Sequence, residues 1–333
     1  MNRLARGNRL YSLAELKRYA ADDLRLLDRV RPDVVVGDFR LSLSASARIA
    51  RVPYVALTNA YWSPYALHRR VPTPSLPMTR YVGVPIASTL FALARPVAFA
   101  WHALPLNLLR KGFGLPVLGL DLRRVYTDAD ITLYADVPEL VPTCQLPPNH
   151  RYIGPVEWAP CIPVPELPVS TPDRPLIYVT LGSSGTGGLL PTILDALATV
   201  ECHVAVATAG TPLPHLPHNV TAADYLPGDR LCESASLVIC NGGSPTSHQA
   251  LARGVPVLGI PFNLDQHLNM EHVAASGAGL SLRPEHACVA NVRSFAVRLL
   301  RDHGYKDKAE RLSRIFGTYD PARELERAIG SLP

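Results

Sequence analysis

The sequence predicts two α/β domains, each a parallel sheet with helices on its faces, and three observations lead to this prediction. Short apolar runs alternate with helix-like segments along most of the 333 residues. A proline-rich stretch, WAPCIPVPELPVSTPDRP, interrupts that alternation and suits a semi-rigid linker. Glycines and polar residues follow several apolar runs, as is typical of ligand-binding parallel sheets. The predicted domains are therefore residues 1–157 and 176–333, joined by a linker at 158–175.

The first domain opens with a predicted helix. Ser12 and Glu15 form a capping-box pattern, and leucines then recur at helical spacing until Pro32 ends the segment. A buried strand follows and ends at Gly37-Asp38, so Asp38 lies at the carboxyl end of a strand, where ligands bind in such sheets. The strands expected in this domain are Val34–Val36, Pro53–Thr58 and Ile131–Tyr134, with a helix at Leu41–Arg51.

The most apolar long segment is Tyr81–Leu109. Arg95 and Pro96 lie at its centre, which argues against a helix that spans a membrane. We expect a set of short helices here, either buried or lying on a membrane surface.

The second domain repeats the alternation of strands and helices, with a helix at Thr192–Thr199 and a mainly helical end at Ala287–Ile329. Its expected strands are Ile177–Leu181, His203–Ala207, Val220–Tyr225, Leu237–Cys240 and Val255–Ile260.

Composition limits the classes of function. The net charge of +5 suits an anionic ligand or a membrane surface, but the arginines are scattered, so nucleic acid is not an expected partner. The six cysteines show no CxxC spacing, and no apolar stretch follows the basic start. We therefore expect a cytoplasmic protein, with or without peripheral contact to a membrane.

Two glycine-containing turns are candidate anion sites. Gly182-Ser183-Ser184-Gly185 lies between a strand and a helix, where backbone N–H groups and the helix dipole favour an anion, although a plain tight turn explains it as well. Asn241-Gly242-Gly243-Ser244 repeats the arrangement, with Thr246 just inside the next helix. These hydroxyls and N–H groups would cradle a diphosphate. The alternative is that Ser244 is an N-cap with Pro245 at the first helical position.

A third polar device, Asp265-Gln266, follows the next strand. A carboxylate acceptor beside an amide that both donates and accepts suits the hydroxyls of a sugar. As an isolated pair it is more often a helix cap. Three such devices on the strand ends of one sheet are hard to explain as caps alone.

Residues 241–280, NGGSPTSHQALARGVPVLGIPFNLDQHLNMEHVAASGAGL, resemble the donor-binding signature of family-1, UDP-sugar-dependent glycosyltransferases of the macrolide type. The resemblance extends to YVTLGSSG at 178–185, ADYL at 223–226 and YIGP at 152–155. It implies two Rossmann-like domains facing across a cleft (the GT-B fold), inversion at the anomeric carbon, and no metal or other cofactor.

The resemblance also implies roles for individual residues. Asn241 stands where the family has a phosphate-contacting histidine, and Gln249 where it has a ribose-binding glutamate; both can still form hydrogen bonds. Asp128-Ala129-Asp130 resembles a metal-binding DxD motif, but it precedes a strand, so no metal is expected there. The implied donor contacts are Gly182, Ser183, Gly242, Gly243, Ser244 and Thr246 for the diphosphate, Tyr225 and Leu226 for the nucleobase, and Asp265 and Gln266 for the sugar.

The first domain departs from the family pattern at its start. Family members begin with a strand and a Gly-His turn, whose histidine deprotonates the acceptor hydroxyl and is oriented by an aspartate. VVVGDF resembles the segment with that aspartate, so Asp38 is the expected orienting acid, but no Gly-His turn precedes it. By this comparison the first domain is incomplete by two or three strand–helix units, about 60 to 100 residues at roughly 30 each.

The leading hypothesis is a hexosyltransferase that moves a sugar from a nucleotide donor, UDP by resemblance, to a hydroxyl of a hydrophobic small molecule or lipid. Tyr81–Leu109 falls where the family builds its acceptor site, although core packing explains the segment equally well. A second hypothesis, motivated by Asn241 and the absent histidine, is a catalytically impaired protein that binds a nucleotide or a partner. Carrier-lipid glycosyltransferases and sugar-nucleotide epimerases share the fold; the Asp265-Gln266 region fits the former better.

Overall fold

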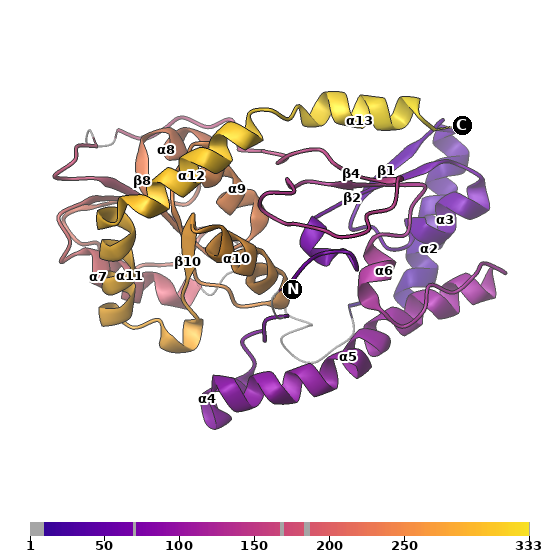
Figure 1. The fold of residues 1–333 in the computed structure, drawn as a ribbon, viewed down its shortest axis with the longest axis horizontal. Helices are drawn as coiled ribbons and strands as arrows, with labels where there is room; N and C mark the ends of the chain where they lie inside the picture. Colours follow the sequence, from indigo (N-terminus) through magenta and orange to yellow (C-terminus); the bar gives the residue numbers. More distant parts are fainter. Residues whose placement is uncertain (1–9, 69–70, 167–169, 183–186, 333) are drawn as a thin grey trace. The chain divides into compact units, whose positions relative to one another are not determined.

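The computed structural model describes residues 10–68, 71–166, 170–182 and 187–332 (Figure 1). The chain forms two compact units, each treated separately below. Unit 1 comprises Met1–Arg70, Pro85–Gly154 and Tyr319–Pro333, and unit 2 comprises Val71–Val84 and Pro155–Thr318. Relative to the domains expected from the sequence, residues 71–84 group with unit 2 and residues 319–333 with unit 1.

Unit 1 contains a four-stranded parallel sheet in the order β1-β2-β3-β4. Three of the strands were expected from their apolar runs. The fourth, β4, was missed because His150–Tyr152 is short, polar and only half-buried. The strands are β1 (Val35–Asp38), β2 (Tyr54–Thr58), β3 (Ile131–Tyr134) and β4 (His150–Tyr152).

Helices cover both faces of this sheet. On one face α3 (Leu43–Ala50) packs against β2, and α2 (Leu13–Val30) packs on α3. The predicted capping box of α2 is present at Ser12 and Glu15. On the other face, α13 (Pro321–Gly330) places Ala328 against the β2 and β3 side chains. The short helices of unit 1 are η1 (Ala60–Trp62) and α6 (Leu122–Tyr126).

The apolar segment is one continuous helix, α5 (Val84–Gly112), and the expectation of several short helices was wrong. Pro96 and Pro105 lie inside it. Each proline removes one helix hydrogen bond, at about 3 kcal/mol, but the Ala- and Leu-rich turns around them have high helix propensity and continue the helix. By length and composition α5 could cross a membrane, and only 6% of its most apolar 18-residue window is buried.

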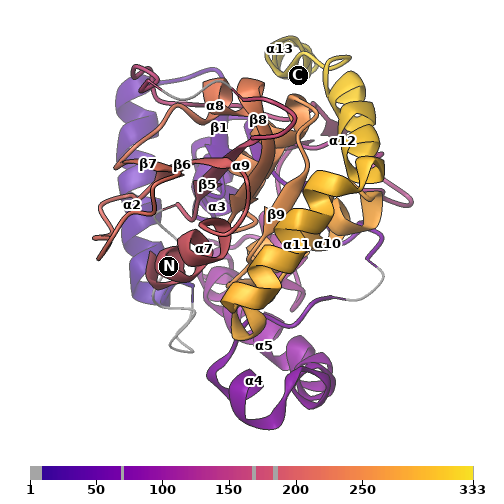
Figure 2. The ribbon, with the colours of Figure 1, turned by 90° about the vertical axis from the view of Figure 1, so that its left-hand side faces the viewer.

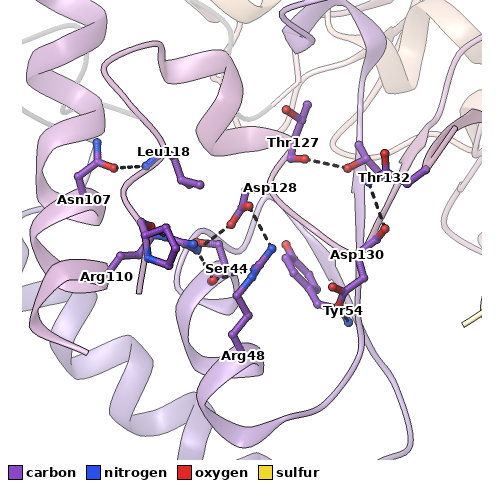
Figure 3. Close-up of polar contacts among 12 residues, drawn as sticks. Ser44, Arg48, Tyr54, Asn107, Arg110, Leu118, Thr127, Asp128, Asp130 and Thr132 are labelled. Atoms are coloured by element: carbon purple, nitrogen blue, oxygen red, sulfur yellow. Dashed lines mark hydrogen bonds and ion pairs between the residues drawn. The ribbon is translucent and has the colours of Figure 1, made fainter. Parts of the chain in front are cut away.

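A buried ion-pair network fixes the C-terminal end of α5 (Figure 3). Arg110, 3% exposed, donates from Nη1 to Asp128 Oδ2 at 2.8 Å, and Arg48 of α3 donates to Asp128 Oδ1 at 3.0 Å. Burial raises the pKa of Asp128 and lowers that of Arg110, so both charges carry a desolvation penalty that their pairing opposes. Asp130 accepts a hydrogen bond from the backbone N–H of Tyr54 at 2.8 Å. Both carboxylates of the DxD-like motif therefore have structural partners.

Unit 2 contains a six-stranded parallel sheet in the order β10-β9-β8-β5-β6-β7. The strand order reverses between β5 and β8, so the topological switch point of the sheet lies between these two strands. Five of the strands were expected, and β10 was missed because it is short and two of its three residues are only half-buried. The strands are β5 (Leu176–Thr180), β6 (His203–Ala207), β7 (Val220–Ala223), β8 (Ala235–Cys240), β9 (Val257–Gly259) and β10 (Gly279–Ser281).

Helices also flank the second sheet on both faces. The helices α7 (Leu190–Leu197) and α11 (Val289–Arg301) lie together on one face, where they share a core with β5, β6, β8 and β9 (Figure 2). The helices α8 (Gly228–Ser234) and α9 (Ser244–Ala252) contact β8, and α12 (His303–Phe316) packs on α9. The remaining helices are α4 (Pro77–Val82), η2 (Gly187–Leu189), α10 (Leu264–Ser276) and η3 (Pro284–His286).

Candidate functional site

The candidate site lies in unit 2, at the carboxyl ends of β5 and β8. Leu181-Gly182 follows β5, and Asn241-Gly242-Gly243 follows β8, so both glycine turns border the switch point. The side chain of Asn241 connects them, because its Nδ2 donates to the carbonyl of Leu181 at 2.9 Å. Its Oδ1 accepts from the N–H of Gly243 at 3.0 Å. Asn241 therefore braces the turn through both ends of its amide.

Gly242 adopts a backbone conformation that other residues avoid. Its φ is +77°, and a Cβ added there would lie 2.5 Å from Cγ of Met270 in α10. Asn269, also in α10 and fully buried, donates from Nδ2 to the carbonyl of Gly242 at 2.8 Å and to Ser247 Oγ at 2.8 Å. Through Asn269 and Met270, the helix α10 thus contacts the turn directly and restricts its backbone conformation.

The turn leads directly into α9. Gly243 is the N-cap residue, with φ −69°, and Ser244 is the first residue of the helix. The alternative that Ser244 is the N-cap residue of α9 is therefore wrong, and the N-cap residue, a glycine, has no side chain with which to cap the helix. Its first N–H groups and the hydroxyl-bearing residues Ser244 and Thr246 lie at the positive end of the helix dipole. Such a terminus suits an anion.

The start of α10 lies against the same turn, since a Cβ on Gly242 would be 3.5 Å from the carbonyl of Gln266. Asn263 is the N-cap of α10, and its side chain accepts from the N–H of Gln266 at 3.0 Å. Gln266 Oε1 accepts from the N–H of Asn263 at 3.3 Å, which completes a capping box, and also from the N–H of Phe262 at 2.8 Å. Asp265 is half-buried in the first turn of α10. The alternative that the Asp265-Gln266 pair is a helix cap is therefore correct for Gln266. Asp265 adds a carboxylate at this edge of the sheet.

Three other predicted donor contacts lie in α9 and in the segment before α8. Gln249 is buried in α9 and donates from Nε2 to the carbonyl of Trp158, and its Oε1 lies near Gly228. Tyr225 is 70% exposed and Leu226 is buried, in the segment between β7 and α8. The helix α8, which follows that segment, contacts α9, the helix that begins at the glycine turn.

Gly182 has φ +59° and is exposed, and a Cβ on it would lie 3.3 Å from Asn241 Nδ2. The structure therefore brings Gly182 and Asn241 together. Ser183, predicted to face the same diphosphate, lies outside the described residues.

Asp38 ends the edge strand β1 of unit 1. Asp38 is exposed as a residue, but partial burial of its carboxyl raises the pKa of that group. Within the described part of the chain, no hydrogen bond or ion pair joins Asp38 to a histidine. The histidine expected by resemblance thus has no counterpart beside this carboxylate among those residues.

A second polar cluster lies near α10 and holds residues 71–84 on unit 2. Glu285 accepts from Thr79 and Ser75, and Arg283 donates to Glu285 Oε1 at 3.0 Å and to the carbonyl of Thr73 at 2.8 Å. Burial alone would raise the pKa of Glu285, but the hydrogen bonds from Thr79 and Arg283 outweigh it and lower the pKa to about 2. His267, beside Gln266, lies 3.4 Å from Ser75 Oγ.

Sequence reasoning missed Asn269 and Met270 as supports of the turn. A signal was present, because they follow Gln266 by three and four residues and so share its helix face. The cluster around Glu285 had no such signal, since its members are about 200 residues apart in the chain.

Comparison with known proteins adds relatives over nearly the whole chain. Residues 191–318 match the Erythromycin biosynthesis protein CIII-like, C-terminal domain family. A PGL/p-HBAD biosynthesis glycosyltransferase of Mycobacterium tuberculosis is 51% identical over 95% of this chain and 74% of its own length. A PGL/p-HBAD biosynthesis rhamnosyltransferase of Mycobacterium bovis is 49% identical over 93% of this chain and 69% of its own length. A shorter relative from the same species, named an inactive PGL/p-HBAD biosynthesis glycosyltransferase, is 55% identical over 59% of this chain and 53% of its own.

Solved structures show the same fold. The calicheamicin glycosyltransferase CalG4 superposes with a TM-score of 0.67 at 22% identity, covering 96% of this chain and 79% of its own. The spinosyn rhamnosyltransferase SpnG, complexed with thymidine diphosphate, gives a TM-score of 0.69 at 19% identity, covering 96% and 80%.

Proposed function

This chain belongs to the macrolide-type family of GT-B glycosyltransferases, and on that premise we propose that it transfers a hexose from a nucleoside-diphosphate sugar to a hydroxyl of a hydrophobic small molecule or lipid. The observation that carries the proposal is the braced glycine turn at the switch point. Gly242 and Gly243 lead into the N-terminus of α9, whose N-cap residue is a glycine, beside the β5 turn at Gly182. This arrangement suits a diphosphate.

The chemistry proposed is a direct displacement with inversion. The acceptor oxygen attacks the anomeric carbon as its proton passes to solvent water, and the nucleoside diphosphate departs with the electrons of the broken C–O bond. The N–H groups at the start of α9, with the hydroxyls of Ser244 and Thr246, stabilise the negative charge that develops on the diphosphate. Asp265 accepts hydrogen bonds from the donor sugar. This scheme needs no metal or other cofactor.

The donor proposed from sequence resemblance is a UDP-hexose. Because the related SpnG structure binds thymidine diphosphate, both pyrimidine nucleotides belong in the test. We place the enzyme in the cytoplasm, where its six cysteines, all free, would stay reduced. Lipid acceptors would be met at a membrane surface.

The test is a transfer assay. The purified chain is incubated with UDP- or TDP-hexoses and a hydrophobic phenol or alcohol in detergent, and the product is identified by mass spectrometry. Anomeric configuration by NMR tests inversion. Calorimetry with UDP and TDP is run in parallel.

A second function remains because one relative is named inactive and Asp38 has no histidine partner among the described residues. In that case the chain binds a nucleotide without transferring sugar. Nucleotide binding with no product from any donor favours this second function, whereas turnover excludes it. Absence of both binding and turnover contradicts the donor site itself.

A further inference from the structure

The helix α5 carries an exposed apolar stripe along one side. Seven large apolar side chains recur every three or four residues, so they project from one helix face. Their exposed fractions run from 37% for Leu104 to 74% for Leu93. The stripe consists of Ile86, Leu90, Leu93, Val97, Trp101, Leu104 and Leu108.

The stripe is not the side of α5 that packs on unit 1. The buried residues Ala103, Leu106 and Leu109 project from other sides of the helix and anchor its C-terminal part. The N-terminal part has little packing and extends away from the helices and sheet of unit 1 (Figure 1). A continuous apolar face of this length marks a surface that another apolar phase covers.

The charge around the stripe identifies that phase. From Tyr81 to Leu120 the chain has no Asp or Glu, although the average of 28 acids in 333 residues would place about three there. Lys111 is exposed at the C-terminal end of α5 and lies on the stripe side, three residues after Leu108. A segment with bases and no acids is complementary to anionic lipid. The amphipathic ring of Trp101 suits the boundary between lipid and water.

A second copy of the chain fits the stripe less well. Paired helices use charged residues on both flanks of the apolar seam to select a partner. The flanks here are Thr89, Ala94, Pro96 and Ala100, which provide no charge.

The ends of α5 show how the helix meets the lipid. Five residues before α5, Thr79 is hydrogen-bonded to Glu285 of unit 2, and at its other end Arg110 is buried against Asp128 of unit 1. A span would place its two ends about 30 Å apart on opposite sides of the membrane. Because Ala103, Leu106, Leu109 and the Arg110–Asp128 pair keep the C-terminal part of α5 in the core of unit 1, the whole helix cannot enter the bilayer and is suited to lie along the surface.

We propose that the α5 stripe docks the enzyme on an anionic membrane, with the helix in the plane of the interface. Apolar side chains enter the acyl boundary and Lys111 meets the headgroups. This inference rests on the proposed transfer to a lipid acceptor, and it names the surface from which that acceptor is taken.

The test is flotation of the full chain with phosphatidylcholine vesicles, with or without phosphatidylglycerol. We expect binding that needs the anionic lipid and weakens with salt. The double variant Leu93→Glu/Val97→Glu changes two side chains that are 74% and 73% exposed, so the fold should persist, which circular dichroism checks. It should lose at least about tenfold in vesicle partitioning. Leu216→Glu, at a 51% exposed site in unit 2, is the matched control and should bind normally.

Quenching by brominated lipids measures the depth of Trp101 in a Trp158→Phe background, because the remaining Trp62 is buried. Strongest quenching by bromines near the headgroups supports the surface orientation, and strongest quenching at the bilayer centre overturns it. Unchanged flotation of the double variant, or a dimer in light scattering that this variant dissociates, also overturns the proposal. Vesicle binding without sugar transfer supports the docking surface and contradicts only the proposed function.

Discussion

Replacing Gly242 by alanine tests whether α10 shapes the glycine turn. The new Cβ would lie 2.5 Å from Met270 Cγ, far inside contact distance, in a fully buried environment. A non-glycine residue at φ +77° costs about 1–2 kcal/mol, and overpacking of a core costs about 1–3 kcal/mol. We therefore expect Gly242→Ala to lower the free energy of unfolding of unit 2 by about 2–5 kcal/mol.

Scanning calorimetry measures this loss, because it resolves the transitions of separate units. For a unit of this size each kcal/mol corresponds to about 2–4 °C in Tm, so the expected decrease is about 4 °C or more. Calorimetric titration with UDP and TDP should show weakened binding, since the displaced turn contains the proposed diphosphate donors.

Gly188→Ala is the matched control, since no atom lies within 4 Å of the added Cβ. It should leave both Tm and nucleotide affinity unchanged. In a Met270→Ala background the steric part disappears, so Gly242→Ala should then cost only the backbone part, about 1–2 kcal/mol. If Gly242→Ala behaves like Gly188→Ala, the turn does not depend on α10 and the reasoning is refuted.

Three further predictions concern buried polar groups. Asn269→Ala leaves two buried acceptors unpaired, so unit 2 should lose about 1–3 kcal/mol in urea unfolding; Asn269→Asp, which also lacks the donor, should not rescue it. The pKa of Glu285 is lowered from 4.5 to about 2, so its ionised form contributes stability that is lost as pH falls through this window; Glu285→Gln should flatten the Tm profile there. Arg110→Ala should cost about 3–5 kcal/mol, because it leaves Asp128 underpaired, whereas Arg48→Ala, 26% exposed against 3%, should cost less. Equal losses from the two arginines would contradict the burial argument.

The strands that could be predicted are those whose apolar runs are long enough to register as a pattern. All five predicted strands of unit 2 are present: β5, β6, β8 and β9 are mostly buried, as in a covered parallel sheet, and the half-buried edge strand β7 still has an apolar run. The strands β4 and β10 lack a buried apolar run, and only pairing with a neighbour defines them. The helix α5 was predicted as several pieces because proline is read as a stop, whereas local helix propensity carried the backbone through Pro96.

The position of the site could also be predicted, because the ends of parallel strands meet at one edge of a sheet. The sequence could not show how each polar side chain is used there. Gln266 forms a capping box, Gln249 bonds the Trp158 carbonyl and Asn241 joins two strand ends. Those partners depend on tertiary contacts, and in the case of Gln249 the partner is 91 residues away.

The structural roles of the Asn241, Gln249 and Gln266 amides limit which groups of unit 2 are available to bind the nucleotide sugar. The side chains of Asn241 and Gln266 maintain the turn and the start of α10, so diphosphate recognition falls mainly on backbone N–H groups and on the hydroxyls of Ser244 and Thr246. Backbone donors cannot be removed by changing one side chain, but they are sensitive to the path of the chain. Nucleotide affinity should therefore depend more on residues that shape the turn, such as Asn269, than on any single polar side chain facing the ligand. The same logic makes Asp265 the exception, since its carboxylate is the one charged side chain among the proposed donor contacts.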